Sequence, residues 1–152
     1  FHHKKLWKFH SIHHSPKEID WLSSARFHPV EIVVVLLILH LFVIIILGLG
    51  LKTAAIAFLT RSLYGYAVHS NVKLSYGPLG YIIASPLFHR WHHTMEKEGQ
   101  DKNFSGIFSL WDYIFGTAYY PKTKQPHNFG VKDNIGDNLW QHIKYPFIDK
   151  KS

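Results

Sequence analysis

The chain has 152 residues, enough for one domain, and a net charge of +7 with its 13 histidines counted as neutral. No basic helix or nucleic-acid-binding motif accompanies this charge, so we expect no nucleic-acid partner. The absence of cysteine excludes disulfides and cysteine-ligated zinc or iron–sulfur sites, so any metal must be held by histidine or carboxylate. The chain begins with Phe1 inside a histidine-rich run, and we expect an N-terminally truncated fragment.

The N-terminal stretch, residues 2–14, mixes histidine, lysine and aromatic residues and is expected to be helical. A break is expected at Ser15-Pro16, because proline lacks an N–H donor and restricts the residue before it. Residues 17–29 are expected to form a short amphipathic piece at the surface.

An apolar pair of segments follows. Residues 30–51 are apolar apart from Glu31 and His40, and about 20 such residues span the hydrocarbon core of a membrane as a helix. Residues 53–69 are apolar again but shorter and interrupted by Arg61, and we expect them to be the returning helix. The alternative for the first segment is a buried helix of a soluble core, although such helices are usually shorter and amphipathic.

The distribution of positive charge favours a hairpin. Of the 17 lysines and arginines, five precede residue 30 and ten follow residue 69. Short loops rich in lysine and arginine stay cytoplasmic, and a hairpin puts both flanks on that one side. The sequence therefore predicts an all-α integral membrane protein, with a transmembrane helical hairpin and a cytoplasmic, histidine-rich helical cap.

Residues 103–152 divide into an aromatic segment and a tail that is soluble in character. Residues 103–121 are aromatic and are expected to pack beneath the histidine-rich site. Residues 122–152 are expected to form a soluble C-terminal tail. We treat residues 1–152 as a single, partial domain.

Two histidine clusters with the same H-x-x-H-H spacing lie far apart in the chain. On a helix, residues at i, i+3 and i+4 share a face, so the three imidazoles of each cluster would point the same way. Neutral imidazole is the commonest nitrogen ligand of transition metals, and six nitrogens exceed the four that one structural zinc takes. The clusters therefore suggest two metals, and a sulfur-free nitrogen set fits iron acting on oxygen, with zinc as the alternative. The clusters are His10, His13 and His14 in FHSIHHS, and His89, His92 and His93 in SPLFHRWHH.

With its flanking motifs, this pattern resembles the fatty acid hydroxylase or sterol desaturase superfamily of integral-membrane di-iron oxygenases. The resemblance covers roughly residues 1–121. The opening residues resemble the end of that family's first H-x-x-x-H motif, with His2 as its second histidine and the first one just before residue 1. The other matching stretches are RFHPVE at 26–31, HSN at 69–71, DKNF at 101–104 and LWDYIFGT at 110–117.

The resemblance implies a ligand set larger than the two clusters. His69, at the end of the second apolar segment, is a further implied ligand, although a histidine there could instead interact with the helix dipole. His28 is another candidate, and its alternative role is to hold the turn around it. Asp112 and Asn103 are expected to accept hydrogen bonds from ligand rings, or alternatively to cap a helix or close a turn. The implied metal ligands are His2, His10, His13, His14, His69, His89, His92 and His93.

The resemblance also implies an activity. Two iron ions would use O2 to remove hydrogen from an unactivated C–H bond of a membrane lipid of sterol or fatty acyl type. Electrons would come from a small redox protein, cytochrome b5-like or ferredoxin-like. The protein would be multi-pass, in a bacterial inner membrane or the endoplasmic reticulum, with its metal site on the cytoplasmic side.

Several alternatives stay open on the sequence. Hydroxylation and desaturation share the first hydrogen abstraction, so both fit the same residues. A zinc-dependent membrane hydrolase would use the same ligand types. A non-enzymatic membrane metal-binding protein is the third possibility.

Overall fold

The computed structural model describes residues 1–121 and 123–148, and over these residues it contains helices and no strand. The predicted all-α class is therefore confirmed for this part of the chain. Over the described residues, one isolated antiparallel β-bridge pairs two loop residues, Thr94 and Phe129. The α-helices are α1 (Lys4–His14), α2 (Pro29–Ile32), α3 (His40–Leu47), α4 (Leu51–Val68), α5 (Pro86–His92), α6 (Leu110–Ile114) and α7 (Leu139–Lys144). A π-helical segment, η2 (Val33–Leu39), and three short 3-10 helices, η1 (Trp21–Ala25), η3 (Gly77–Tyr81) and η4 (Tyr145–Phe147), complete the set.

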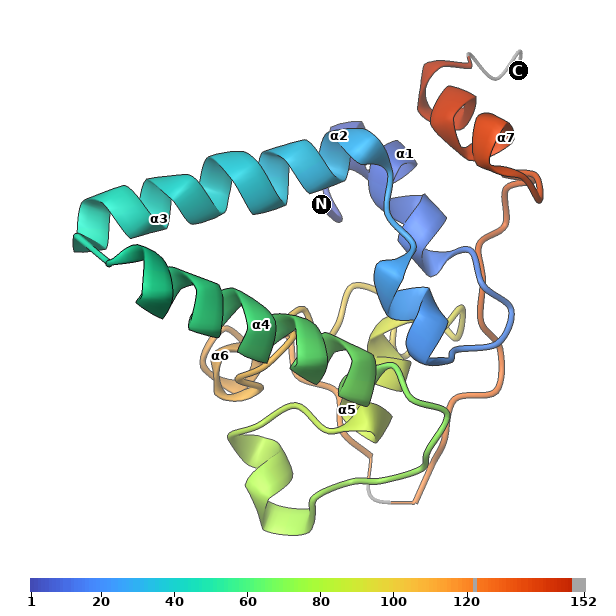
Figure 1. The fold of residues 1–152 in the computed structure, drawn as a ribbon. Coiled ribbons are helices and arrows are strands. Elements are labelled where there is room, and N and C mark those ends of the chain that lie inside the picture. The colour runs from blue at the N-terminus through green and yellow to red at the C-terminus, as the bar shows by residue number, and fades with distance from the viewer. Residues whose placement is uncertain (122, 149–152) are drawn as a thin grey trace.

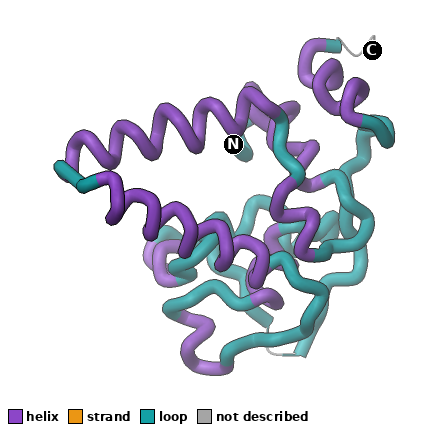
Figure 2. Tube along the Cα trace, in the orientation of Figure 1, coloured by secondary structure: helices purple, strands orange, loops and turns teal. Residues whose placement is uncertain are grey.

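The arrangement is a V of two long helical rods, with most of the other elements at its open end and α6 below α4 (Figure 1). One arm is the continuous rod formed by α2, η2 and α3, and the other is α4. The chain reverses between Gly48 and Gly50, where Gly48 has φ +61°, a conformation that side-chain-bearing residues rarely adopt. Loops make up most of the chain at the open end (Figure 2).

The first arm has the properties of a membrane span. It runs from Pro29 to Leu47 over 19 residues, with a mean hydropathy of 3.3 and only 7% of it buried inside the protein. Over the described residues it is the one helix long and apolar enough to cross a membrane. Helix α4 has 18 residues but carries Lys52 and Arg61, so the predicted hairpin of two crossing helices stays a prediction.

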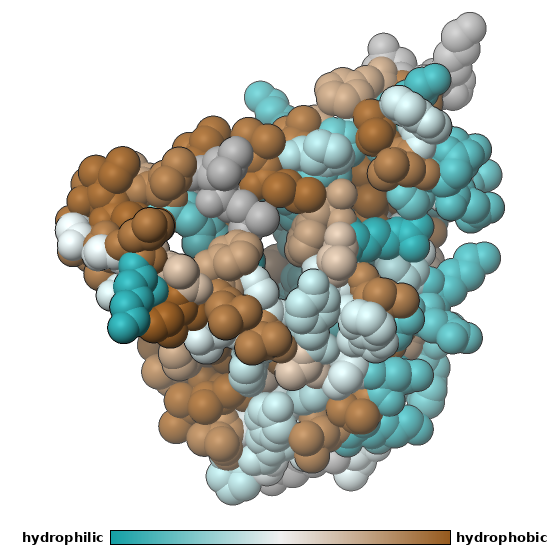
Figure 3. All heavy atoms as spheres, in the orientation of Figure 1, coloured by the Kyte–Doolittle hydropathy of each residue, from teal (hydrophilic) through white to brown (hydrophobic). Residues whose placement is uncertain are grey.

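The two ends of the molecule differ in polarity. Apolar side chains cover the tip of the V and the face below it, whereas hydrophilic ones gather on the opposite side (Figure 3). His40, within the apolar rod, bonds the carbonyl of Val35 in its own helix, with Nδ1 and O 2.5 Å apart.

The C-terminal segment packs against α1. Ile12 forms a small apolar core with Ile135 and Tyr145, all at most 8% exposed. Helix α7 also accepts a hydrogen bond from His28, whose ring Nε2 lies 3.1 Å from the carbonyl oxygen of Ile143. Of the predicted tail at 122–152, residues 122 and 149–152 lie outside the described residues, and the rest is folded against the histidine-bearing part.

Candidate metal centre

Eight histidine side chains meet at the open end of the V in two groups of four. Within each group, one nitrogen from every ring lies within 4.8 Å of the others. All eight ligands implied by the resemblance belong to these groups. The first group is His2, His10, His14 and His92, and the second is His13, His69, His89 and His93.

The helical spacing of the two clusters explains the grouping. In α1, His10 and His14 are four residues apart and belong to the first group, while His13 lies between them and reaches the second. In α5 and its C-cap the assignment is reversed. His89 and His93, four residues apart, belong to the second group, and His92 belongs to the first. Each cluster therefore contributes to both groups, and His69 completes the second from the C-cap of α4.

The rings approach one another through their Nε2 atoms. The Nε2 atom of His2 lies 3.3 Å from that of His92, and those of His10 and His14 are 3.2 Å apart. In the second group, the Nε2 of His69 lies 3.2 Å from that of His13 and 3.0 Å from that of His89. His93 continues the chain of contacts, with its Nε2 3.1 Å from that of His89.

Backbone carbonyls fix which nitrogen carries the proton. The Nδ1 atom of His13 lies 3.2 Å from the carbonyl oxygen of Arg26, and that of His69 lies 2.7 Å from the carbonyl oxygen of Gly65. Because a carbonyl oxygen only accepts, each Nδ1 must carry the hydrogen. In a neutral ring this leaves Nε2 as a bare lone pair, so the contact between these two rings brings two lone pairs together and is not a hydrogen bond.

Burial keeps the rings of His13, His69 and His92 neutral. It lowers the pKa of His69 from 6.5 to about 4 and that of His92 to about 3, with repulsion from neighbouring imidazoles adding to the effect at His92. The pKa of His13 is likewise lowered well below 6.5 by burial and then by His69 and other histidines. Neutral imidazole is the form that ligates metals, so at neutral pH the rings are ready to bind.

A pair of metal ions fits this geometry. With metal–nitrogen bonds of about 2.0–2.1 Å and angles between tetrahedral and octahedral values, adjacent ligand nitrogens lie about 2.8–3.4 Å apart. The observed Nε2 separations of 3.0–3.3 Å fall in that interval. A cation between the rings would turn facing lone pairs into ligand bonds, and the all-imidazole donor set suits iron or zinc.

One buried carboxylate supports the first group and was not assigned a role from the sequence. Glu31, in α2, is 3% exposed, and its Oε1 lies 2.7 Å from Nδ1 of His10. A carboxylate behind a ligand ring fixes its tautomer and orientation. The sequence did carry a signal, since a charged residue at the start of an apolar segment needs a partner.

Three of the predicted site residues have other roles. Both ring nitrogens of His28 are engaged, because Nδ1 accepts the N–H of Val30 at 3.0 Å and Nε2 faces α7, so this ring lies outside both groups. Asp112 accepts the N–H of Phe104 at 2.8 Å instead of an imidazole. Asn103 bonds backbone groups, donating to the carbonyl of Phe88 at 2.9 Å. Neither residue thus accepts a hydrogen bond from a ligand ring; both instead stabilise loops, in line with the alternative of closing a turn.

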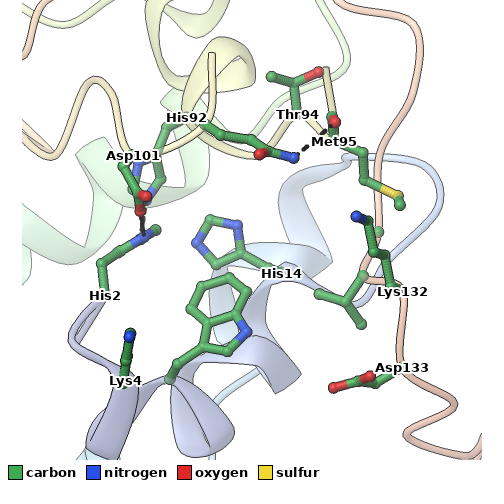
Figure 4. Close-up of a pocket in the computed structure, with 13 residues that line it drawn as sticks. His2, Lys4, His14, His92, Thr94, Met95, Asp101, Lys132 and Asp133 are labelled. Atoms are coloured by element: carbon green, nitrogen blue, oxygen red, sulfur yellow. Dashed lines mark hydrogen bonds and ion pairs between the residues drawn. The ribbon is translucent and has the colours of Figure 1, made fainter. Parts of the chain in front are cut away.

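Two cavities reach the histidines from different sides. One, of about 500 Å³, lies between the arms of the V and is lined by both groups together with apolar residues such as Val35 and Phe58. The other, of about 490 Å³, borders His14 and is lined mainly by loops. Figure 4 shows this second cavity, with Asp101 across from α1 and Lys132 on its far side.

Comparison with known proteins gives a consistent picture. Residues 1–117 match the family model described as fatty acid hydroxylase. The chain is 28% identical to an ornithine lipid hydroxylase of Rhizobium tropici over 97% of its own length and 44% of that protein's. It is 29% identical to human alkylglycerol monooxygenase over 93% of its length and 30% of that protein's.

A sphingolipid C4-hydroxylase of Schizosaccharomyces pombe is 28% identical over 83% of this chain and 43% of that protein. The chain thus spans less than half the length of these curated relatives. No solved structure matches it.

Proposed function

The chain belongs to the fatty acid hydroxylase family, and on that premise we propose that it forms the histidine-rich part of a membrane enzyme that hydroxylates a C–H bond of a lipid. The observation that carries the proposal is the convergence of eight imidazoles into two groups with facing Nε2 atoms. Cations between the facing lone pairs would stabilise such an arrangement, and two of them would match the two groups.

The relatives favour hydroxylation over desaturation. Their names describe hydroxylases and monooxygenases acting on ornithine lipid, alkylglycerol and sphingolipid. These lipids differ in backbone and polar group, so what they share is an amphiphile with long apolar chains. We assign the same class of substrate to this chain.

The eight histidines would hold two iron ions, one in each group. Bound iron would supply the O2 and one-electron chemistry that imidazoles alone cannot. Other residues of the chain fix the ligand rings. Glu31 and the backbone carbonyls of Arg26 and Gly65 hold the rings they contact in the tautomer that exposes Nε2. All four rings of the second group are buried, which limits the access of water to them.

The cavity between the arms is the proposed substrate site. Its walls combine apolar residues of the two arms, including Ile32 and Phe58, with His13 and His69 of the second group. A lipid chain lying in this cavity would be flanked by apolar side chains and end against the imidazoles. Arg61 and Ser62 also line it and offer contacts to a polar part of the lipid.

The cavity on the other side is the proposed route for electrons. Trp7 lies there with its ring centroid 5.1 Å from that of His2 and 5.2 Å from that of His14. Lys4 and Lys132 line the same cavity (Figure 4). A small acidic redox protein, cytochrome b5-like or ferredoxin-like, is the proposed donor, since opposite charges steer such partners together.

The proposed topology follows from the charges and the V. If α4 returns across the membrane beside the first arm, both basic flanks and all eight histidines lie on the cytoplasmic side. This puts the substrate cavity at the level of the lipid chains and the other cavity toward the cytoplasm.

Two measurements on the full-length protein test the function. Metal analysis should find about two irons per chain, and oxygen uptake should begin when a reductant is added. Lipidomics of cells with and without the gene should show a lipid heavier by one oxygen atom, absent from cells that carry His92→Ala. Zinc without oxygen uptake would favour a hydrolase, and weak, exchangeable metal with no lipid product would favour a metal-binding protein.

A further inference from the structure

Helix α6 buries its polar side chains and exposes its apolar ones. Its polar residues point inward: Asp112 is 2% exposed, and Ser109, at the N-cap, is 0% exposed. Its apolar residues point outward, with Trp111 54%, Ile114 60% and Phe115 74% exposed. A helix on the surface of a protein in water shows the opposite pattern.

Hydrogen bonds hold the helix in this orientation. The carboxylate of Asp112 accepts the backbone N–H groups of Phe104 and Ser105, each at 2.8 Å. The hydroxyl of Ser109 donates to the carbonyl of Gly80 at 2.8 Å. Rotating α6 to bury its apolar face would break all of these bonds and leave buried polar groups unpaired. These hydrogen bonds therefore fix the apolar face of α6 on the outside of the fold.

The exposed apolar surface continues beyond α6. The backbone N–H of Leu110 donates to the carbonyl of Ile82 at 3.4 Å, which joins α6 to the segment that follows η3. Asp112, which is buried, is the one charged residue between positions 103 and 121. We call the combined surface the outer apolar patch, and it consists of Leu79, Tyr81, Ile82, Phe108, Leu110, Trp111, Ile114 and Phe115, all exposed by 43–74%.

The patch lies on the same side of the molecule as the arms of the V. The loop before α6 and the second arm share a cavity, which Gly106 and Ile107 line together with Phe58 and Ser62 of α4. Figure 1 shows α6 beside α4, and Figure 3 shows apolar side chains below the tip of the V. The residues of the first arm are similarly exposed, as Ile45 is at 75%.

We infer that the outer apolar patch rests in the membrane, at the boundary between the lipid chains and the headgroups. Contiguous apolar patches on proteins in water are small, and large ones mark an interaction surface. Tryptophan and tyrosine are enriched at membrane–water interfaces, and the patch contains both. The loop before α6 lies next to the second arm, where Ile56, Leu59 and Leu63 are likewise exposed by 57–59%, and the bilayer is the partner that would cover both surfaces. The chain thus has a second membrane contact, which sets the height of the histidines above the lipid and opens the substrate cavity at bilayer level.

Site-directed spin labelling tests this inference directly, since the chain has no cysteine of its own. The full-length protein, with any cysteine elsewhere replaced, is labelled at Phe115→Cys or at Trp140→Cys and reconstituted in phosphatidylcholine vesicles. The two positions are matched, because Phe115 is 74% and Trp140 is 70% exposed, but Trp140 lies on α7, at the open end of the V and away from both its tip and α6. Relaxation by O2, which concentrates in lipid, is compared with relaxation by a water-soluble nickel chelate.

The inference predicts that the label at 115 responds more to O2 than to nickel, and that the label at 140 does the reverse. Equal responses at the two positions would overturn it. So would a label at 115 that neither reagent reaches, because a second copy or another segment of the protein would then cover the patch. The metal content of the labelled protein is measured alongside, so loss of the histidine site is distinguished from loss of membrane contact.

Discussion

Acid should destabilise the metal-free protein through His69, whose ring is buried in its neutral form. In the folded chain its pKa is about 4, lowered from 6.5 by burial against the favourable effects of the Gly65 carbonyl and Asp20. In the unfolded chain the ring takes up a proton near pH 6.5. Between these values the unfolded state binds more protons, so the stability present above pH 6.5 is lost as the pH falls toward 4.

The magnitude follows from the two pKa values. Lowering a pKa from 6.5 to about 4 corresponds to about 3 kcal/mol of stability above pH 6.5 that is absent in acid. For a protein of this size or somewhat larger, that amount corresponds to roughly 6–12 °C in melting temperature. Burial of His92 and His13 acts in the same direction, so the wild-type protein should lose more stability in acid than His69 alone accounts for.

The assay is thermal melting of the chelated, detergent-solubilised protein from pH 7.5 to pH 4.5, for wild type and His69→Gln. Glutamine has no titrating proton, so the variant should lose less stability in acid by about the amount above. His127→Gln, which removes an exposed ring, is the control and should follow the wild type. A His69→Gln variant as acid-sensitive as the wild type would refute the idea that burial holds this ring neutral.

Other variants test the site and its support. His92→Ala should abolish iron retention and turnover, whereas His142→Ala, outside both groups, should do neither; iron per chain and product formation decide this. Glu31→Leu should weaken metal binding by about 10–100-fold in a titration with a competing chelator. Glu31→Gln should weaken it less, because an amide oxygen can still accept the ring N–H. Asp112→Asn should cost about 1–3 kcal/mol in thermal stability, because the carboxylate accepts two backbone N–H groups. Gly80→Ala should cost roughly 1–3 kcal/mol in the same assay, because the new Cβ would lie 2.8 Å from a backbone oxygen and from a tyrosine ring.

The sequence predicted the two histidine clusters because helical periodicity places residues three and four apart on one face. It did not predict how the clusters share two groups, since that depends on how α1 and α5 face each other. His10 and His13 belong to different groups although they lie on one helix face. The contribution of His69 came from the family resemblance, because a lone histidine at the end of an apolar segment has no spacing to identify it.

The aromatic segment at 103–121 shows where pattern reasoning failed. We expected its rings to pack beneath the site, and Phe104 does contact His2, with ring centroids 5.0 Å apart. Trp111 and Phe115 instead point outward. The expectation assumed that apolar side chains turn inward, which holds only where the surroundings are water. Next to a candidate membrane span, the same residues can face lipid, and buried polar residues such as Asp112 then hold the loop together.

The interior of this chain is unusual in what it buries, and this bears on why the metals matter. The small apolar core around Ile12 lies at one side, whereas the centre, where α1, α5 and the end of α4 meet, is filled by imidazoles. Two of these rings, His89 and His93, have a buried Nδ1 without a hydrogen-bond partner. Buried polar groups of this kind oppose folding unless something binds them. Metal ions bound by Nε2 atoms from three helices would leave these Nδ1 atoms unpaired, but the metal–nitrogen bonds would offset their cost, so the ions that carry the proposed chemistry would also hold the three helices together.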